Sequence, residues 1–272
     1  GVDCLVYKDH KVIFSYTAGM NDITENKKLT GDELYIIYSM TKMITCTAAL
    51  QLLEQGKYKL SDYLSDYMPE FSKMKIARDE LDTSNAANIT TGKSSGEIVN
   101  SNSDGFAQNP ITIKDLFTMS AGLDYALCDD AINKAKADGK KSTRDLVGAM
   151  SQKVLGFEPG TRFRYSLCHD VLGALIEIWS GKKLGEYFKE NIFIPLGMNS
   201  TFFGVPKDAE RLNRMAALYS RDENGNPRKV GLSCAYNISD EYESGGAGLI
   251  SCTEDYALFL DALACGGVSK TG

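Results

Sequence analysis

Histidine is nearly absent from this sequence, which contains only His10 and His169 in 272 residues. A catalytic metal site built from histidines is therefore not expected. No apolar run approaches the roughly 20 residues that cross a bilayer, and no run of Lys and Arg accompanies the formal net charge of −6. We consequently expect no membrane span in this chain and no nucleic-acid partner.

Paired cysteines are also absent. The seven cysteines stand singly, without a C-x-x-C pair, and their number is odd. This spacing argues against a disulfide framework and a structural zinc site, and unpaired thiols favour a reducing, cytoplasmic compartment. The chain begins at Gly1 rather than Met and stops at Gly272 within a turn-like stretch. We therefore expect a piece to be missing at both ends, which leaves the compartment and the oligomeric state open.

The sequence does have an ordinary globular composition, with 43% hydrophobic and 24% charged residues. Two β-rich runs flank the polar turn Lys8–Lys11 and predict a β-hairpin over residues 4–19, with His10 facing solvent. A short apolar run over 34–38 precedes an amphipathic helix over 40–55. Further helices are predicted at 112–119, 142–154, 169–180, 183–192 and 253–264, and a polar surface loop at 83–109. Strands near the start and helices in the middle indicate a mixed α+β fold.

The pattern S-x-x-K occurs three times, at Ser39, Ser72 and Ser180. Only Ser39 follows an apolar, strand-like run and opens a long amphipathic helix. Ser72 lies in a polar linker, and Ser180 lies at a helix end, where lysines are common because of the helix dipole. Context therefore selects Ser39, with Lys42, as the candidate pair.

The spacing of Ser39 and Lys42 suits nucleophilic chemistry. A hydroxyl is a poor nucleophile until a base removes its proton, and residues i and i+3 of a helix share one face. Lys42 can act as that base where burial or neighbouring cations favour its neutral amine, and the Ser39 N–H can stabilise an oxyanion. From these residues alone, a helix-capping Ser39 beside a solvated Lys42 remains the simpler interpretation.

Several ordered segments along the chain give this pair its context. The motif Tyr38–Lys42 with its following helix resembles the nucleophile motif of the penicillin-recognising, serine β-lactamase-like superfamily, for which S-x-x-K is a signature. This superfamily includes class C β-lactamases, D-Ala-D-Ala carboxypeptidases and β-lactamase-type carboxylesterases. Other segments that resemble the family are Asp32–Leu34, Gln51–Lys57, Leu60–Asp62, Ile111–Leu116, Met119–Leu123, Phe157–Gly160, Pro195–Met198 and Gly245–Leu249.

The resemblance implies the DD-peptidase/β-lactamase-like fold, an antiparallel sheet flanked by helices with a mainly helical subdomain. Residues 1–56 would supply the N-terminal strands and the nucleophile helix. Residues 57–264 would form the helical subdomain with its loop insertion at 83–109, and 265–272 would begin the return to the sheet, whose C-terminal strands are expected beyond this chain. Lys270–Gly272 matches the family's third motif, Lys-Thr-Gly, in letters only, because no strand pattern precedes it; the third motif is expected after residue 272.

The resemblance also assigns a third catalytic residue, Tyr165. The second motif of the family is usually Tyr-x-Asn, with the tyrosine as a proton shuttle, and Leu167 stands here where the asparagine usually does. Losing that amide favours the esterase-like branch over true β-lactamases. His169, four residues after Tyr165, either tunes the tyrosine or makes a structural hydrogen bond at a helix start.

Together these residues imply a serine hydrolase that works by two-step acyl transfer without metal or cofactor. Lys42, with Tyr165, would deprotonate Ser39, an acyl-enzyme would form, and water would release it. Small-molecule esters are the expected substrates, and β-lactams or D-peptides are the alternative. A protein of another class also fits the altered second motif: a penicillin-binding or sensor protein that acylates without turnover. The substrate-binding residues stay unidentified at this level.

Overall fold

The chain forms two units, each assembled from separated stretches of sequence. The computed structural model describes residues 1–77, 105–127, 129–232 and 236–270. The first unit comprises Gly1–Tyr38, Gly185–Asn237 and Gly248–Gly272, and the second comprises Ser39–Leu184 and Ile238–Ala247. Most of the predicted loop 83–109, and the last two residues of the Lys-Thr-Gly match, lie outside the described residues. The predicted division of the chain at residue 56 stays a prediction.

The first unit opens on the predicted β-hairpin, in which β1 (Val2–Lys8) pairs antiparallel with β2 (Lys11–Ala18). The turn residues Asp9 and His10 have φ of 50° and 62°, the left-handed values that tight hairpin turns use to match the strand twist. The expectation that His10 faces solvent is wrong, because its Nδ1 lies 2.7 Å from Asp261 Oδ2. A contact with a helix near the end of the chain therefore decides the position of this side chain.

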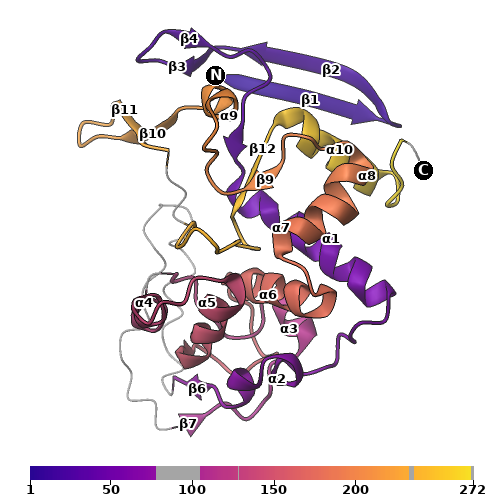
Figure 1. Ribbon diagram of the computed structural model, residues 1–272, viewed down its shortest axis with the longest axis vertical. Helices are drawn as coiled ribbons and strands as arrows, with labels where there is room; N and C mark the ends of the chain where they lie inside the picture. The colour runs from indigo at the N-terminus through magenta and orange to yellow at the C-terminus, as the bar shows by residue number, and fades with distance from the viewer. Residues whose placement is uncertain (78–104, 128, 233–235, 271–272) are drawn as a thin grey trace. The chain divides into compact units, whose positions relative to one another are not determined.

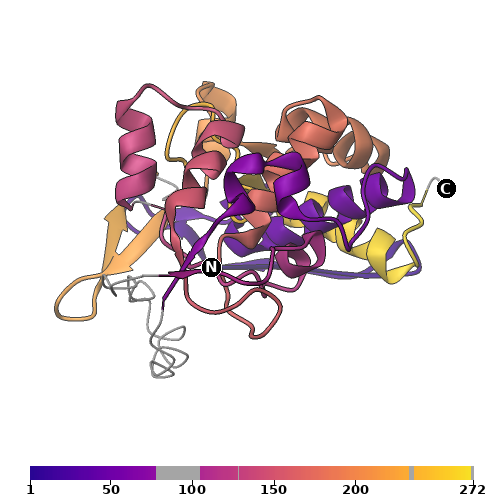
Figure 2. The same cartoon turned by 90° about the horizontal axis from the view of Figure 1, so that it is seen from below.

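Short strands and helices complete the first unit. Its central strand is β12 (Leu249–Ser251), which pairs antiparallel with β5 (Tyr35–Ile36) and with β9 (Phe202–Phe203). The other elements are β3 (Met20–Asp22), β4 (Lys27–Lys28), the π-helical η5 (Lys189–Phe193), α8 (Ile194–Leu196), α9 (Ala209–Arg214), β10 (Leu218–Arg221), β11 (Pro227–Val230) and α10 (Thr253–Ala264). The β10–β11 hairpin is drawn in orange in both views (Figure 1, Figure 2), and α10 packs against β1.

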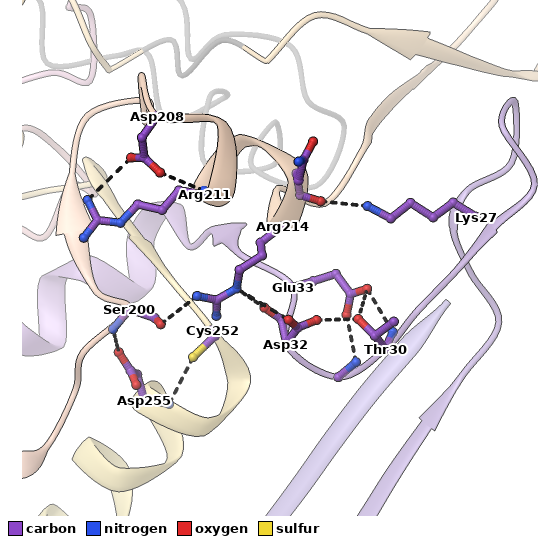
Figure 3. Close-up of polar contacts among 12 residues, drawn as sticks. Lys27, Thr30, Asp32, Glu33, Ser200, Asp208, Arg211, Arg214, Cys252 and Asp255 are labelled. Carbon is purple, nitrogen blue, oxygen red and sulfur yellow. Dashed lines mark hydrogen bonds and ion pairs between the residues drawn. The ribbon is translucent and has the colours of Figure 1, made fainter.

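A small apolar core and one arginine hold the β5–β12–β9 sheet to its flanking segments. The core residues are Leu34, Ile36, Met215, Ile250 and Cys252. Arg214 donates from Nε to the Asp32 carbonyl at 2.9 Å and from Nη1 to the Ser200 hydroxyl at 3.1 Å (Figure 3). Arg214 therefore ties the segment before β5 to the segment before β9.

Helices dominate the second unit. In Figure 1, α1 (Thr41–Glu54) and α6 (Cys168–Ser180) are its two long helices; α6 packs against α1 and also contacts α3 (Ile113–Phe117) and α5 (Thr143–Ala149). Fully buried residues of the two long helices include Ile44, Ala48, Val171, Leu172 and Leu175. The other elements are η1 (Tyr38–Met40), α2 (Leu64–Tyr67), η2 (Pro69–Ser72), β6 (Lys75–Ile76), β7 (Gly105–Phe106), α4 (Asp130–Ala137), η4 (Met150–Gln152) and β8 (Val154–Leu155). Helix α7 (Leu184–Phe188) begins with the last residue of the stretch Ser39–Leu184 and otherwise belongs to the first unit.

Side-chain caps set the start of several of these helices. The side chains of Thr112, Asp129 and Ser142 each accept a hydrogen bond from the backbone N–H three residues later, at the starts of α3, α4 and α5. Such caps satisfy N–H groups that have no partner inside the helix. Local sequence therefore fixes these boundaries, independently of long-range packing.

The predicted α+β class is confirmed, and the predicted helices are present. The helix predicted over 40–55 is α1, those over 169–180 and 253–264 are α6 and α10, and that over 183–192 is α7 followed by the π-helical turn. The helix predicted over 142–154 is shorter, because α5 tightens into the 3-10 turn η4 after Ala149. Among the described residues, no helix combines the length and the apolar character that a membrane span requires.

Candidate active site

Ser39 lies where the apolar run over 34–38 gives way to α1, in the 3-10 turn η1. The residue before it, Tyr38, has φ of 44°, a left-handed value that is strained for a bulky side chain. The N-cap of α1 is Met40, which makes no side-chain cap hydrogen bond. Ser39 thus does not cap the helix. The residue is exposed, and its hydroxyl contacts other side chains.

Two side chains contact the Ser39 hydroxyl. Lys42 Nζ lies 3.2 Å from Ser39 Oγ, and the Tyr165 hydroxyl lies 2.7 Å from the same atom. Lys42 is only 7% exposed, so it is not a solvated first-turn lysine. The structure therefore brings Ser39, Lys42 and Tyr165 together at one oxygen atom, although 126 positions separate the serine from the tyrosine.

The Lys42 amine has two further polar contacts. Nζ donates to the Gly246 carbonyl at 2.7 Å and to the Tyr125 hydroxyl at 3.3 Å. It also lies 5.3 Å from the centre of the Tyr125 ring and 4.7 Å from that of Tyr165, and such ring faces attract a cation. With Ser39, these contacts give the Lys42 amine three hydrogen-bond partners. The amine is therefore held in one orientation.

Tyr125 is a site residue that the sequence reasoning missed. It follows the family-like segment Met119–Leu123 by two positions, and this proximity was the only available signal. Its loop is anchored on both sides by Lys153, whose side chain is 3% exposed. Lys153 Nζ donates to Asp124 Oδ1 at 3.0 Å and to the Ala126 carbonyl at 2.7 Å. A buried, charge-assisted clamp of this kind fixes the backbone that carries Tyr125.

Tyr165 is held next to that loop by its own neighbours. The Arg164 N–H donates to the Met119 carbonyl and the Leu167 N–H to the Asp124 carbonyl, each at 3.0 Å. These bonds place the Tyr165 and Tyr125 ring centres 5.2 Å apart. Leu167 is fully buried in the core and has no side-chain polar group. The Tyr125 hydroxyl, and no amide at position 167, is thus the side-chain group that bonds Lys42 Nζ besides Ser39.

His169 is part of the packing between α1 and α6. Its side chain is buried, and Nε2 lies 3.5 Å from Cys46 Sγ. Burial, together with the positive charge of Lys42, lowers the pKa of His169 to about 4, while burial raises the pKa of the Cys46 thiol to about 11. Both groups are therefore neutral near pH 7, so this pair is neither a thiolate nucleophile nor a cationic partner for Tyr165.

Stability should fall as the pH drops from about 6.5 to about 4. In that range the unfolded chain protonates His169 while the folded chain does not, so the unfolded state binds more protons. The loss is of the order of 3 kcal/mol if the whole shift is realised. Urea unfolding measures the free energy of unfolding at pH 7 and at pH 4.5. The difference between the two values should be much smaller in His169→Gln than in the unmodified chain. In a His10→Asn background the single remaining imidazole can be followed by NMR, and its titration near 6.5 would contradict the prediction.

The other two S-x-x-K matches have different surroundings. Ser180 is the last residue of α6, and its hydroxyl donates to the Ile176 carbonyl at 2.6 Å. Gly181, in the left-handed conformation, ends the helix before Lys183. Ser72 ends the short η2 turn, and Lys75 follows in strand β6 rather than on the same helix. Neither serine shares a helical face with its lysine.

Possible metal ligands gather in the first unit. Within the part of the chain that the structure describes, His10, Asp261 and Cys265 form the one group of three such side chains. Ser39, Lys42, Tyr125 and Tyr165 supply hydroxyl and amine groups rather than a metal-ligand set.

Comparison with known proteins identifies the family. A family model described as Beta-lactamase matches residues 1–271. The chain belongs to the beta-lactamase family. The chain is 28% identical over 269 residues to Protein Rv1367c of Mycobacterium tuberculosis. This alignment covers 97% of the chain and 62% of that protein. The chain is also 30% identical over 237 residues to lovastatin esterase of Penicillium rubens, with 85% of this chain and 55% of the esterase covered.

A solved structure shows the same fold. EstCE1, described as a hydrolase with promiscuous acyltransferase activity, aligns with a TM-score of 0.70 at 24% identity over 96% of this chain and 66% of its own. The β-lactamase-like fold expected from the sequence is therefore confirmed. The chain spans 62% and 55% of the lengths of the two curated relatives.

Proposed function

We propose that this beta-lactamase family member is a serine hydrolase that forms an acyl-enzyme on Ser39 with small carboxylic esters. One observation carries the proposal: Ser39 Oγ lies within hydrogen-bond distance of both Lys42 Nζ and the Tyr165 hydroxyl. A nucleophile whose oxygen contacts groups able to exchange its proton is the arrangement that acyl transfer requires.

The proposed reaction has two steps. Ser39 Oγ attacks the ester carbonyl carbon while its proton passes, directly or through the Tyr165 hydroxyl, to the neutral amine of Lys42. The Ser39 N–H donates to the developing oxyanion. The tetrahedral intermediate then breaks its bond to the alcohol oxygen, which takes up the proton and leaves. Water attacks the resulting ester of Ser39 by the same proton path. Carboxylic acid and free serine are the products of this second step.

Two findings favour esters over β-lactams. The buried Leu167 provides no amide to bind an amide substrate, and two of the similar proteins are described as an esterase and as a hydrolase with acyltransferase activity. The second description supports a related candidate, transfer of the acyl group to an alcohol, because an alcohol can replace water in the second step.

A substrate panel tests the proposal. We expect the chain to hydrolyse p-nitrophenyl acetate and butyrate with turnover, and to release transfer products when a primary alcohol is added. Turnover of a chromogenic cephalosporin but not of the esters would identify a β-lactamase instead. A stable mass adduct on Ser39 without turnover of any substrate would identify the binding or sensor protein and overturn the hydrolase proposal.

A further inference from the structure

A buried carboxylate lies behind the Lys42 amine. Asp170, on α6, is 1% exposed and is not used in the proposed reaction. Its Oδ1 accepts hydrogen bonds from the Tyr242 hydroxyl at 2.8 Å and the Ser244 hydroxyl at 2.6 Å, and the Gly246 backbone N–H also donates to this carboxylate. Three donors from one short segment, Tyr242–Ala247, therefore converge on one side chain.

The segment passes so close to α6 that two of its positions require glycine. A Cβ on Gly246 would lie 2.4 Å from Asp170 Oδ2, and one on Gly245 would lie 2.4 Å from the His169 carbonyl oxygen. Real Cβ atoms do not approach other heavy atoms so closely. The Ser-Gly-Gly sequence at 244–246 thus has a direct physical reason, which is close contact between backbone and buried carboxylate.

The opposite side of the same segment contacts α1. The Gly245 carbonyl accepts a hydrogen bond from Thr45 Oγ1 at 2.7 Å, and the Gly246 carbonyl accepts one from Lys42 Nζ at 2.7 Å. The N–H of Gly246 therefore bonds to Asp170 while its C=O bonds to Lys42. One residue connects the buried carboxylate to the amine that contacts Ser39.

The Lys42 amine also acts electrostatically on the Asp170 carboxyl group. Burial raises the pKa of Asp170, while the hydrogen bonds from Ser244 and Tyr242 and the positive charge of Lys42 act in the opposite direction. A lysine side chain is long and flexible, so it keeps a single orientation only where fixed acceptors hold its amine. For Lys42, the Gly246 carbonyl is such an acceptor.

We propose that Asp170 is a positioning residue, which fixes the Tyr242–Ala247 segment so that the Gly246 carbonyl holds the Lys42 amine against the Ser39 hydroxyl. The inference rests on the proposed function. It predicts that Asp170 matters for the rate of acylation and little for substrate binding, since Asp170 lies behind the amine and does not touch the Ser39 oxygen.

Asp170→Asn tests this, with Glu177→Gln as the matched control. Glu177 is a half-buried carboxylate on the same helix, and it accepts a hydrogen bond from the Leu184 N–H at 3.0 Å. We expect Asp170→Asn to lower kcat for p-nitrophenyl butyrate about 10- to 100-fold, the range seen when groups that orient a functional side chain are removed. KM should change less than about threefold. Glu177→Gln should leave both constants within about twofold of the unmodified chain.

Two further variants test the proposal if Asp170→Asn folds poorly. Ser244→Ala and Tyr242→Phe each remove one donor, and each should lower kcat by about three- to tenfold at nearly unchanged KM. A loss of thermal stability in all three variants with kcat within twofold of the unmodified chain would overturn the proposal and leave Asp170 a purely structural residue.

A readout that does not need turnover separates this inference from the proposed function. The Lys42 side-chain ¹³Cε resonance, assigned with Lys42→Arg, should move in Asp170→Asn and stay in place in Glu177→Gln. If the unmodified chain fails to hydrolyse any ester while the resonance moves as expected, the proposed function fails and the positioning role stands. An unmoved resonance in folded Asp170→Asn contradicts the positioning role whatever the activity.

Discussion

Ser39→Ala should lower ester hydrolysis by at least about 10³-fold, and it should abolish formation of a covalent acyl adduct. The reason is that alanine leaves the Lys42 amine and the Tyr165 hydroxyl without the oxygen atom that both contact, and so without a nucleophile. Loss of the side chain should cost little stability, because Ser39 is exposed. Steady-state turnover of p-nitrophenyl butyrate and intact mass after treatment with a fluorophosphonate measure the two effects.

The chain provides its own control for this substitution. Ser180 also begins an S-x-x-K tetrapeptide, but its hydroxyl is bonded to the Ile176 carbonyl at a helix end. Ser180→Ala should keep full activity and the fluorophosphonate adduct. If Ser39→Ala retains more than a tenth of the turnover, or if the adduct maps to another residue, Ser39 is not the nucleophile.

The second large effect is expected at the two groups that contact Ser39 Oγ. Tyr165→Phe and Lys42→Met should each lower kcat by about 10²- to 10⁴-fold, the contribution typical of general acid–base groups. Because both groups act on the same proton, their effects should not add, and the double variant should be little slower than the slower single variant. Acylation rates measured by stopped flow test this non-additivity.

Tyr58→Phe is the matched control for the loss of a phenol. The Tyr58 hydroxyl donates to the Ala49 carbonyl at 2.8 Å and its ring stacks on Trp179, so the variant loses a buried hydrogen bond, worth about 1 kcal/mol, at no cost in turnover. Fully additive effects of Tyr165→Phe and Lys42→Met would mean that the two side chains serve separate steps. Wild-type turnover in either single variant would remove that residue from the proposed mechanism.

The side-chain partner of the Lys42 amine differs from the one that the family resemblance implied. In the usual second motif an asparagine amide stands two residues after the tyrosine, whereas Leu167 here is buried in the core. The Tyr125 hydroxyl contacts the amine instead, on a loop that Lys153 holds. The amine therefore keeps a side-chain hydrogen-bond partner although the amide is missing.

The sequence by itself determined the local features of this protein. The hairpin of β1 and β2, the extents of α1, α6 and α10, and the placement of Ser39 and Lys42 one turn apart all follow from periodicity, turn residues and caps, which act over a few neighbouring residues. The resemblance to a known family added Tyr165. It also supplied the fold, because ordered motifs identify a chain arrangement that periodicity cannot.

Only the tertiary structure decided what surrounds the Lys42 amine. Tyr125 lies 83 positions from Lys42 in the sequence, and Gly246 lies 204 positions away. No periodic pattern relates residues so far apart, and their approach depends on how α1 packs on α6 and on two loops with little regular structure. The same reason explains why Asp170, an acidic residue within a helix, is buried beside the Tyr242–Ala247 segment, and why His10 contacts Asp261 of α10.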